Sequence, residues 1–364
     1  MTAVRAMCSA RNRHDRHHEE QGNNQMAAQS GLLAEVTRGG RVESHHLGRA
    51  VVVDADGGVV WSCGDVDAAV FPRSTVKSLL AIELVESGAA DRLGLSNDAL
   101  ALACASHGGE KAHAEMAATM LASVGRDVTA LECGTHWPTY EPAGRALAAA
   151  HQDACPLHNN CSGKHAGMVC LSCDQGVDPT GYIDPSHDIQ RRVTDVLAAM
   201  MDTPHDDSNR GMDGCSMPTY AVPLKALAKG FARFGAGTGL SEGRFRAATR
   251  LREAVAANPF MVAGTGRYDT KIMDRFGTRA FVKMGAEGVM IASLPELGLG
   301  LAIKTDDGAN RAAEVAMSAL MRRFGGETLC RDEADREILD TTSTQILRNW
   351  NGFTVGEIRS ALPR

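Results

Sequence analysis

The chain has 364 residues, 44% hydrophobic and 23% charged, which are ordinary proportions for a folded protein. The length predicts one large unit or two closely packed domains, and the composition excludes a fully disordered chain, a collagen-like fibre and a coiled coil. The net charge of −6 gives no electrostatic basis for nucleic-acid binding, and no apolar run reaches the roughly 18 residues of a membrane span. We therefore expect a soluble protein without nucleic-acid or membrane partners.

The cysteines and the N-terminus point to a cytoplasmic location. Ten cysteines lie at irregular spacing, far below the density of a disulfide-stabilised scaffold, so we expect mostly free thiols. The pair Cys170 and Cys173 lies in an apolar helical run, which favours packing over redox chemistry. Residues 1–28 are polar and lack the apolar run of a secretory signal. They predict a disordered tail, followed by a single unit over residues 29–364.

In chain order, the first predicted element is a β-hairpin. The apolar segments 49–54 and 59–61 flank Asp56-Gly57-Gly58, which is typical of a hairpin turn. Helical periodicity then recurs in five segments, at residues 71–88, 110–124, 189–201, 244–257 and 309–324.

Three strand-like segments lie between the last two predicted helices, at residues 279–284, 289–293 and 299–304. The sequence Pro295-Glu-Leu-Gly298 joins the last two of them as an antiparallel hairpin. The pattern predicts an α+β fold in which a largely antiparallel sheet packs with helices in a three-layer α/β/α arrangement.

Ser74 and Lys77 form the first motif that could carry chemistry. Residues three apart share one face of a helix, so the hydroxyl and the amine can meet. A helix N-terminus disfavours a protonated lysine and favours a developing alkoxide, as activation of a nucleophile requires. The alternative is an N-cap serine followed by a solvated lysine, and this motif alone does not decide between the two.

Two further motifs follow in the chain. Ser106 lies in the small-residue turn 104–109, and Lys283 stands near the end of a predicted strand in a Lys-x-Gly pattern. The order of a Ser-x-x-Lys motif, a serine in a turn and a Lys-x-Gly strand resembles that of serine β-lactamases and penicillin-binding proteins. In those enzymes a serine nucleophile with lysine partners transfers an acyl group from an amide. The ordered set therefore favours acyl transfer.

Two loop-like segments, dense in small and polar residues, each contain one cysteine, Cys161 and Cys215. Thiolates are preferred ligands of zinc, and Lys164 and His165 follow Cys161 by about one helical turn. The spacing leaves two interpretations open, which are an open zinc site and a pair of buried free cysteines.

Together these motifs resemble the L-asparaginase II family, the rhizobial-type or class 3 L-asparaginases, which are distinct from the asparaginases with a threonine nucleophile. The resemblance spans roughly residues 32–325 in collinear order, and Asn160-Cys-Ser-Gly-Lys-His165 is its most specific string. The other matching strings are Arg73-Ser-x-x-Lys77, Cys104-Ala-Ser-His107, Asp213-Gly-Cys-x-x-Pro-Thr219, Gly264-x-Gly-Arg-Tyr268 and Lys283-x-Gly-Ala286.

The resemblance implies a fold similar to serine β-lactamases and glutaminases, in one catalytic unit with a sheet-containing part and a helical part. It also implies hydrolysis of L-asparagine to L-aspartate and ammonia by a homodimer. The implied catalytic residues are two tandems, Ser74 with Lys77 and Ser106 with Lys283. The implied Zn²⁺ ligands are Cys161, Lys164 and Cys215, and the implied substrate-binding residues are Arg73, Asn160, His165 and Asp213.

Charge complementarity assigns the substrate's α-carboxylate to Arg73 and its α-ammonium to Asp213. The chain departs from the family pattern at Asp269, which follows Arg-Tyr where a family member has a cysteine. Because this position lies close to the expected site, we expect it to alter metal affinity or substrate preference.

The predicted mechanism is nucleophilic acyl transfer. Ser74 attacks the side-chain amide carbon, Lys77 accepts its proton, and Ser106 with Lys283 relays a proton to the departing ammonia. Zinc is expected to support substrate orientation without generating the nucleophile. Two alternatives remain, which are an amidohydrolase that uses zinc-bound hydroxide and a non-catalytic protein that binds an amino acid in the same pocket.

Overall fold

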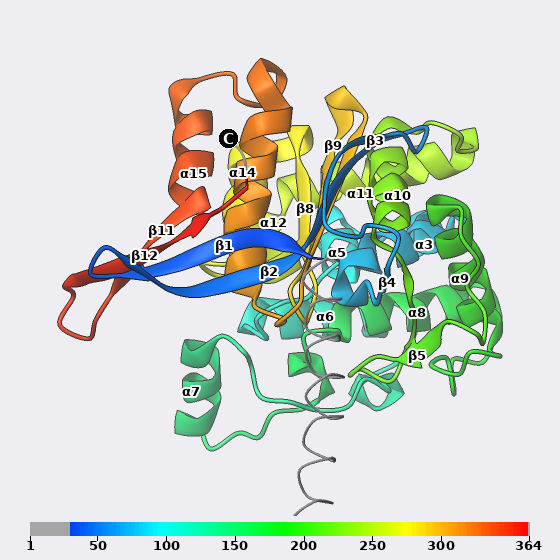
Figure 1. The fold of residues 1–364 in the computed structure, drawn as a ribbon. Helices are drawn as coiled ribbons and strands as arrows, with labels where there is room; N and C mark the ends of the chain where they lie inside the picture. The colour runs from blue at the N-terminus through cyan, green and yellow to red at the C-terminus, as the bar shows by residue number, and fades with distance from the viewer. Residues whose placement is uncertain (1–29, 363–364) are drawn as a thin grey trace, which may run out of the picture.

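The structure is a computed structural model that describes residues 30–362. An antiparallel sheet of eight strands lies beside a large group of helices (Figure 1). In sheet order, the strands of its main path are β11 (Thr344–Arg348), β12 (Thr354–Ser360), β1 (Gly31–Arg38), β2 (Arg41–Asp54), β10 (Leu299–Thr305), β9 (Val289–Leu294) and β8 (Phe281–Met284). The remaining strand, β3 (Val59–Cys63), pairs with β2. The predicted α+β class with an antiparallel sheet is confirmed.

The helices are α2 (Lys77–Leu80), α3 (Ile82–Glu86), α4 (Ala89–Arg92), α5 (Asn97–Ala103), α6 (Lys111–Ala122), α7 (Glu141–Ala149), α8 (Ser162–Asp174), α9 (Asp188–Met201), α10 (Leu224–Ala236), α11 (Glu242–Ala257), α12 (Pro259–Ala263), α13 (Tyr268–Phe276), α14 (Asn310–Leu329) and α15 (Glu333–Ser343). Two short ribbons pair β4 (Ala69–Val70) with β7 (Val222–Pro223) and β5 (Arg210–Met212) with β6 (Pro218–Tyr220).

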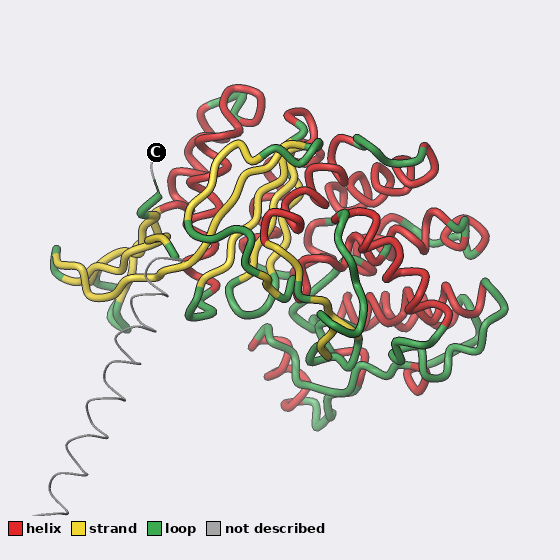
Figure 2. Tube along the Cα trace, turned by 45° about the vertical axis from the view of Figure 1, so that its right-hand side comes forward, coloured by secondary structure: helices red, strands yellow, loops and turns green. Residues whose placement is uncertain are grey.

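Helices cover both faces of the sheet centre. Helix α10 lies so close to one face that a Cβ on Gly300 would be 1.9 Å from the Ala228 carbonyl oxygen. All six residues of β9 are buried, and since successive side chains of a strand point to opposite faces, both faces must be covered. Helix α14 also packs against β9 and β10, and Figure 2 shows helices on either side of the strands. This is the predicted three-layer arrangement.

Most predicted elements are present with small changes at their ends. The first hairpin is formed by β2 and β3, and the second by β9 and β10 around Pro295–Leu297. The predicted helices at 110–124, 189–201, 244–257 and 309–324 correspond to α6, α9, α11 and α14.

The prediction of one continuous helix over residues 71–88 is wrong. The segment is divided into a 3-10 turn, η1 (Arg73–Val76), and the short helices α2 and α3. Arg73, the first residue of η1, has a φ of +51°, outside the right-handed helical region, and Val76 has a ψ of 4° between η1 and α2. The predicted end at Gly88 is confirmed, because this glycine has a φ of +78° and stops α3 from continuing.

Several elements have no counterpart among the sequence predictions. The chain after Phe324 forms the end of α14, then α15, β11 and β12, which complete one side of the sheet. The nine cysteines in the described part of the chain are free, and Cys170 is buried within α8, as its apolar context predicts. The tail predicted at residues 1–28 lies outside the described residues.

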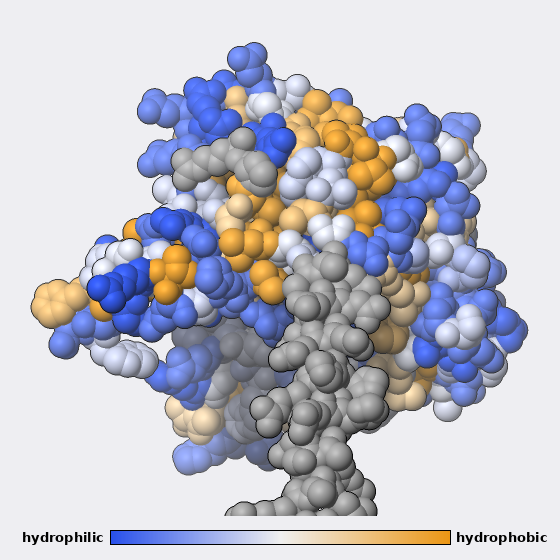
Figure 3. Space-filling view, in the orientation of Figure 1, coloured by the Kyte–Doolittle hydropathy of each residue, from blue (hydrophilic) through white to orange (hydrophobic). Residues whose placement is uncertain are grey.

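The surface carries both hydrophilic and apolar side chains. Figure 3 shows hydrophilic residues over the outer helices and hydrophobic residues over the middle of this face. Exposed apolar side chains include Leu47, Val59 and Val60 near the hairpin of β2 and β3, and Trp350 and Phe353 between β11 and β12. Within residues 30–362, no helix is both long and apolar enough to cross a membrane.

Asp335 fixes α15 to the rest of the fold. Its fully buried carboxylate accepts hydrogen bonds from Arg275 and Arg279, each at 2.6 Å, and from the Arg331 backbone N–H at 2.9 Å. Burial raises the pKa of this carboxyl, but the arginines and the N–H group outweigh burial and lower the pKa to about 2. Because the pKa is depressed by folding, the stabilisation is complete above about pH 4 and is lost as pH falls through about 2.

We predict that Asp335→Ala lowers the free energy of unfolding by about 3 kcal/mol at pH 7, because the substitution removes a fully buried carboxylate and leaves two partly buried guanidinium groups without it. The matched control is Asp340→Ala on the same helix, where the carboxylate is 62% exposed beside Arg322. The control should change the free energy by less than about 0.5 kcal/mol. Urea denaturation of the two variants measures both values, and equal losses would contradict the role assigned to Asp335.

Candidate active site

Two serine hydroxyls meet where η1 faces the turn after α5. Ser106 Oγ lies 3.5 Å from Ser74 Oγ. The Thr75 backbone N–H and hydroxyl both donate to the Pro72 carbonyl oxygen, at 3.2 Å and 2.7 Å, which fixes the turn that holds Ser74. The Ser106 backbone N–H donates to Val262 at 2.9 Å. Both hydroxyls are therefore held on hydrogen-bonded backbone.

Lys77 is buried beside this pair. Its side chain is 1% exposed, and its Nζ donates to the Ala105 carbonyl at 2.7 Å and the Asn160 carbonyl at 3.5 Å. The expected tandem with Ser74 thus has both residues in the same turn of chain. The Lys77 amine donates to the carbonyl oxygen of Ala105, the residue before Ser106. Lys77 therefore connects the two segments that carry the serines.

Lys283 comes from the edge strand β8, which packs against η1. Its Nζ, also 1% exposed, donates to the Met284 carbonyl at 2.8 Å and lies 3.6 Å from Asp269 Oδ2. Burial lowers the pKa of Lys283 to about 8, with Lys77 and Arg267 acting in the same direction and Asp269 opposing them. The amine can therefore exchange a proton near neutral pH, as acid–base catalysis requires.

Cys161, Lys164 and Cys215 form a second buried cluster, with Lys164 Nζ 3.0 Å from Cys215 Sγ. The hydrogen bond from Cys161 holds the pKa of Cys215 far below its usual range, despite burial, and Lys164 contributes. The same interaction and burial raise the pKa of Cys161. Burial lowers the pKa of Lys164, but the two sulfurs outweigh burial and raise it. The protein without metal therefore pairs a thiolate with an ammonium.

This donor set fits a zinc ion. Two cysteine sulfurs and an amine converge, and loss of their protons would give three ligands of types that bind zinc or related metals. Across residues 30–362, no group of three or more His, Cys, Asp or Glu side chains could hold a metal ion. The zinc hypothesis therefore depends on Lys164 as the third donor.

Arg73 and Asp213 form an ion pair next to Ser74. Arg73 Nε and Asp213 Oδ1 are 2.8 Å apart, and the side chains are 25% and 14% exposed. The Arg73 backbone has a φ of +51°, a conformation that costs of order 1–3 kcal/mol in a residue other than glycine. The Gly214 N–H also donates to Asp213 at 2.7 Å. One positive and one negative side chain, each partly accessible, are thus placed beside the serine hydroxyl.

Asn160 and His165 lie between the two clusters. The Asn160 backbone carbonyl accepts from Lys77 and from the His107 N–H at 3.2 Å, while its side-chain oxygen is 3.1 Å from Cys161 Sγ. His165 Nδ1 lies 2.6 Å from the Tyr182 hydroxyl. Burial, aided by Lys164, lowers the pKa of His165 to about 4, so the ring is neutral at physiological pH.

The sequence analysis did not select Tyr182 or His107. Tyr182 is fully buried and also accepts from the Glu132 N–H at 2.9 Å, but it lies in a loop where no local pattern marks it. His107 Nε2 lies 3.0 Å from the Ser162 hydroxyl, and its ring stacks on His113. It belongs to the matching string Cys104-Ala-Ser-His107, which is the signal that could have identified it.

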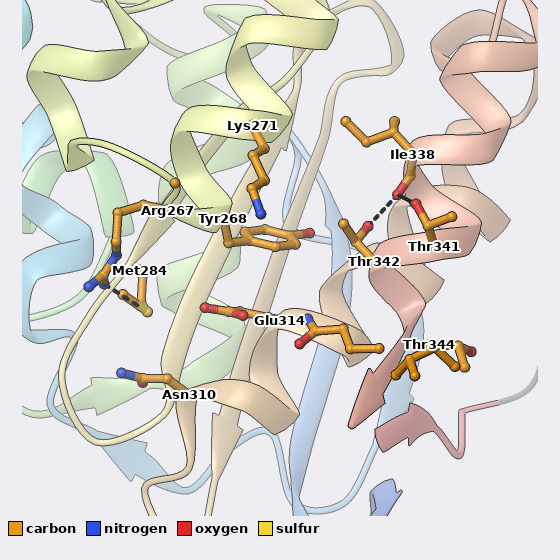
Figure 4. Close-up of a pocket in the computed structure, with 13 residues that line it drawn as sticks. Arg267, Tyr268, Lys271, Met284, Asn310, Glu314, Ile338, Thr341, Thr342 and Thr344 are labelled. Atoms are coloured by element: carbon orange, nitrogen blue, oxygen red, sulfur yellow. Dashed lines mark hydrogen bonds between the residues drawn. The ribbon is translucent and has the colours of Figure 1, made fainter. Parts of the chain in front are cut away.

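A cavity of about 810 Å³ lies beside Lys283, between α13, α14, α15 and β11 (Figure 4). Arg267 reaches the sulfur of Met284 at 3.8 Å on one side of this cavity, and Lys271 and Glu314 line it. Burial, with a contribution from Asp269, raises the pKa of Glu314. Asp269 therefore interacts both with Glu314, which lines the cavity, and with Lys283.

Comparisons with known proteins identify the family. The family model described as L-asparaginase II matches residues 34–360, which extends the resemblance beyond residue 325. Among solved structures, the chain has 14% identity and a TM-score of 0.39 with a β-lactamase from Mycobacterium bovis, covering 76% of this chain and 94% of that one. A candidate β-lactamase from Bacteroides dorei gives 14% identity and a TM-score of 0.37, covering 72% and 86%. No curated protein matches the chain. On the extent of the family match, the chain belongs to the L-asparaginase II family.

Proposed function

We propose that the protein is an L-asparaginase that hydrolyses L-asparagine to L-aspartate and ammonia by serine–lysine nucleophilic catalysis. Family membership indicates an asparaginase-type amidohydrolase. The observation that supports the finer proposal is the pair of hydroxyls, Ser74 and Ser106, 3.5 Å apart. Two buried lysines lie on neighbouring segments: Lys77 donates to the carbonyl of the residue before Ser106, and Lys283 lies on β8, which packs against η1. A binding protein has no chemical need for two hydroxyl groups with neighbouring buried amines.

The ion pair beside Ser74 supports an amino acid as substrate. Arg73 would bind the α-carboxylate and Asp213 the α-ammonium, because each group of the zwitterion replaces one partner of the existing ion pair. Asn160 and His165 complete the substrate-binding set in this proposal. The strained backbone at Arg73 fixes the guanidinium in advance of binding, which reduces the entropy lost on association.

In the first half of the reaction, Ser74 Oγ attacks the side-chain amide carbon and Lys77 takes its proton. Backbone N–H groups near Ser74 stabilise the developing oxyanion. Lys283 gives a proton to Ser106 as Ser106 gives its own to the amide nitrogen, so ammonia leaves and an aspartyl ester remains on Ser74. Water then attacks the ester and gives one proton to Lys283, while Lys77 returns its proton to Ser74 as the ester bond breaks. The second water hydrogen leaves as the carboxyl proton of the product and is taken up by the released ammonia.

In this proposal, Cys161, Lys164 and Cys215 would hold Zn²⁺, which would act as a Lewis acid that orients the substrate. Lys164 must release its proton for this role, while the Tyr182 hydroxyl fixes the neutral ring of His165 beside the cluster. A homodimer and a cytoplasmic location are further parts of the proposal, from the resemblance and the cysteine content respectively.

We predict that the wild-type protein releases ammonia from L-asparagine with a kcat/KM far above that for L-glutamine. Ser74→Ala should lose at least about 10³-fold in kcat, because the nucleophile is removed. Ser62→Ala, on the exposed surface of β3, is the control and should retain full activity. Coupled detection of ammonia measures both. Near-normal turnover by Ser74→Ala would refute the nucleophile, and absence of release from either amide by folded wild-type protein would refute the substrate.

The pH dependence tests the role of Lys283. Because Lys283 must be protonated to act as the acid, kcat/KM for L-asparagine should fall as pH rises through about 8, the pKa that burial gives this amine. A profile of kcat/KM between pH 6 and 10 measures this limb. If activity instead increases through pH 8, Lys283 acts as a base and the assignment is reversed.

For the metal, we predict that the protein purified in the presence of zinc contains about one zinc ion per chain, as measured by elemental mass spectrometry. Cys215→Ala should lose that zinc, because one of three ligands is missing. Cys173→Ala in α8 is the control and should keep its zinc. Chelation should raise KM more than it lowers kcat. Complete loss of kcat on chelation would instead favour attack by a zinc-bound hydroxide.

A further inference from the structure

A buried carboxylate lies beside the amine of Lys283. Asp269 and Lys283 are each 1% exposed, and Asp269 Oδ2 is 3.6 Å from Lys283 Nζ. The same oxygen accepts the Met284 N–H at 2.9 Å, while Lys283 Nζ donates to the Met284 carbonyl at 2.8 Å. Both charged groups are thus fixed to one residue of β8, which sets their separation.

The position of Asp269 suits a negative charge. It lies in the first turn of α13, where the backbone N–H groups and the helix dipole favour an anionic side chain. Its second oxygen, Oδ1, is buried without a hydrogen-bond partner in the described part of the chain. This oxygen is free to accept a further hydrogen bond.

The other ionisable groups around the pair do not replace this carboxylate. Lys77, the first residue of α2, and Arg267, the residue before α13, both act to lower the pKa of Lys283. Burial raises the pKa of the Cys104 thiol, after α5, to about 12 and raises that of Tyr268, so both are neutral. Glu314 on α14 interacts with Asp269 from the cavity side.

We infer that Asp269 is a positioning residue that holds the proton on Lys283 and fixes its amine beside the serine pair. The inference rests on the proposed asparaginase function and deepens it. Held by this ion pair, Lys283 stays an ammonium long enough to pass its proton to Ser106, whose own proton goes to the leaving amide nitrogen. The C–N bond breaks with its electron pair on ammonia, and Lys283 regains a proton when water hydrolyses the ester.

Asp269→Asn is the direct test, because the amide keeps an acceptor for the Met284 N–H and removes the charge. The alkaline limb of kcat/KM should move from about pH 8 to lower pH by at least about one unit, which is a tenfold loss above the limb. Asp269→Glu, which restores the charge, should return the limb toward its original position. A variant that loses the same factor at every pH would show a merely structural role and would overturn the inference.

Glu314→Gln is the matched control, since it removes a neighbouring, partly buried carboxylate that is not part of the Lys283–Asp269 ion pair. Its limb should move by less than half of the shift seen in Asp269→Asn. An equal shift would mean that the charges around the cavity in general, rather than Asp269 in particular, keep Lys283 protonated.

A second measurement does not depend on turnover. The full-length protein labelled with ¹³C at the lysine ε-carbons can be titrated by NMR, with Lys283 assigned from Lys283→Arg. We expect Lys283 to be protonated at pH 6 in the wild type and to lose its proton at a lower pH in Asp269→Asn. Lys283 already neutral at pH 6 in the wild type would overturn the inference even if the variant does not fold. If the titration behaves as expected but no ammonia is released, the proposed function fails and the ion-pair assignment stands.

Discussion

Three buried lysine side chains, Lys77, Lys164 and Lys283, impose the constraint on which the site depends. A buried amine without a hydrogen-bond partner is unfavourable, so each amine requires its own partner inside the protein. Lys77 has backbone carbonyls, Lys164 has the Cys215 thiolate and Lys283 has the Asp269 carboxylate. These partners come from segments far apart in the chain, and satisfying them fixes how η1, α8 and β8 meet.

The different partners give the amines different chemistry. Backbone carbonyl oxygens accept hydrogen bonds from Lys77, whereas the Lys164 amine lies 3.0 Å from the Cys215 sulfur, which in the proposed function would also bind the zinc ion. Burial makes Lys283 easier to deprotonate and Asp269 opposes this, which leaves a pKa near the working range of an enzyme. One nearby surface element, the Arg73–Asp213 pair, stays partly accessible and offers complementary charges to an amino acid.

Sequence patterns were sufficient where local burial decides structure. The hairpin of β9 and β10 and the helices α6 and α11 follow from apolar periodicity and turn residues. Periodicity did not predict the break in residues 71–88, because the positive φ of Arg73 and the ψ of 4° at Val76 leave no mark in the spacing of apolar residues. The contacts of Tyr182 and the Lys283–Asp269 pair are likewise tertiary, and the sequence indicated Asp269 only as a departure from the family pattern.

The most direct test of the central claim is to look for the covalent intermediate. Wild-type protein mixed with L-asparagine, quenched in acid within the first turnover and digested, can be analysed by peptide mass spectrometry. The account predicts an aspartyl ester on the peptide that contains Ser74, and specifically on that residue. An ester on Ser106 instead, or rapid turnover with no modified serine at any time point, would contradict nucleophilic catalysis by Ser74.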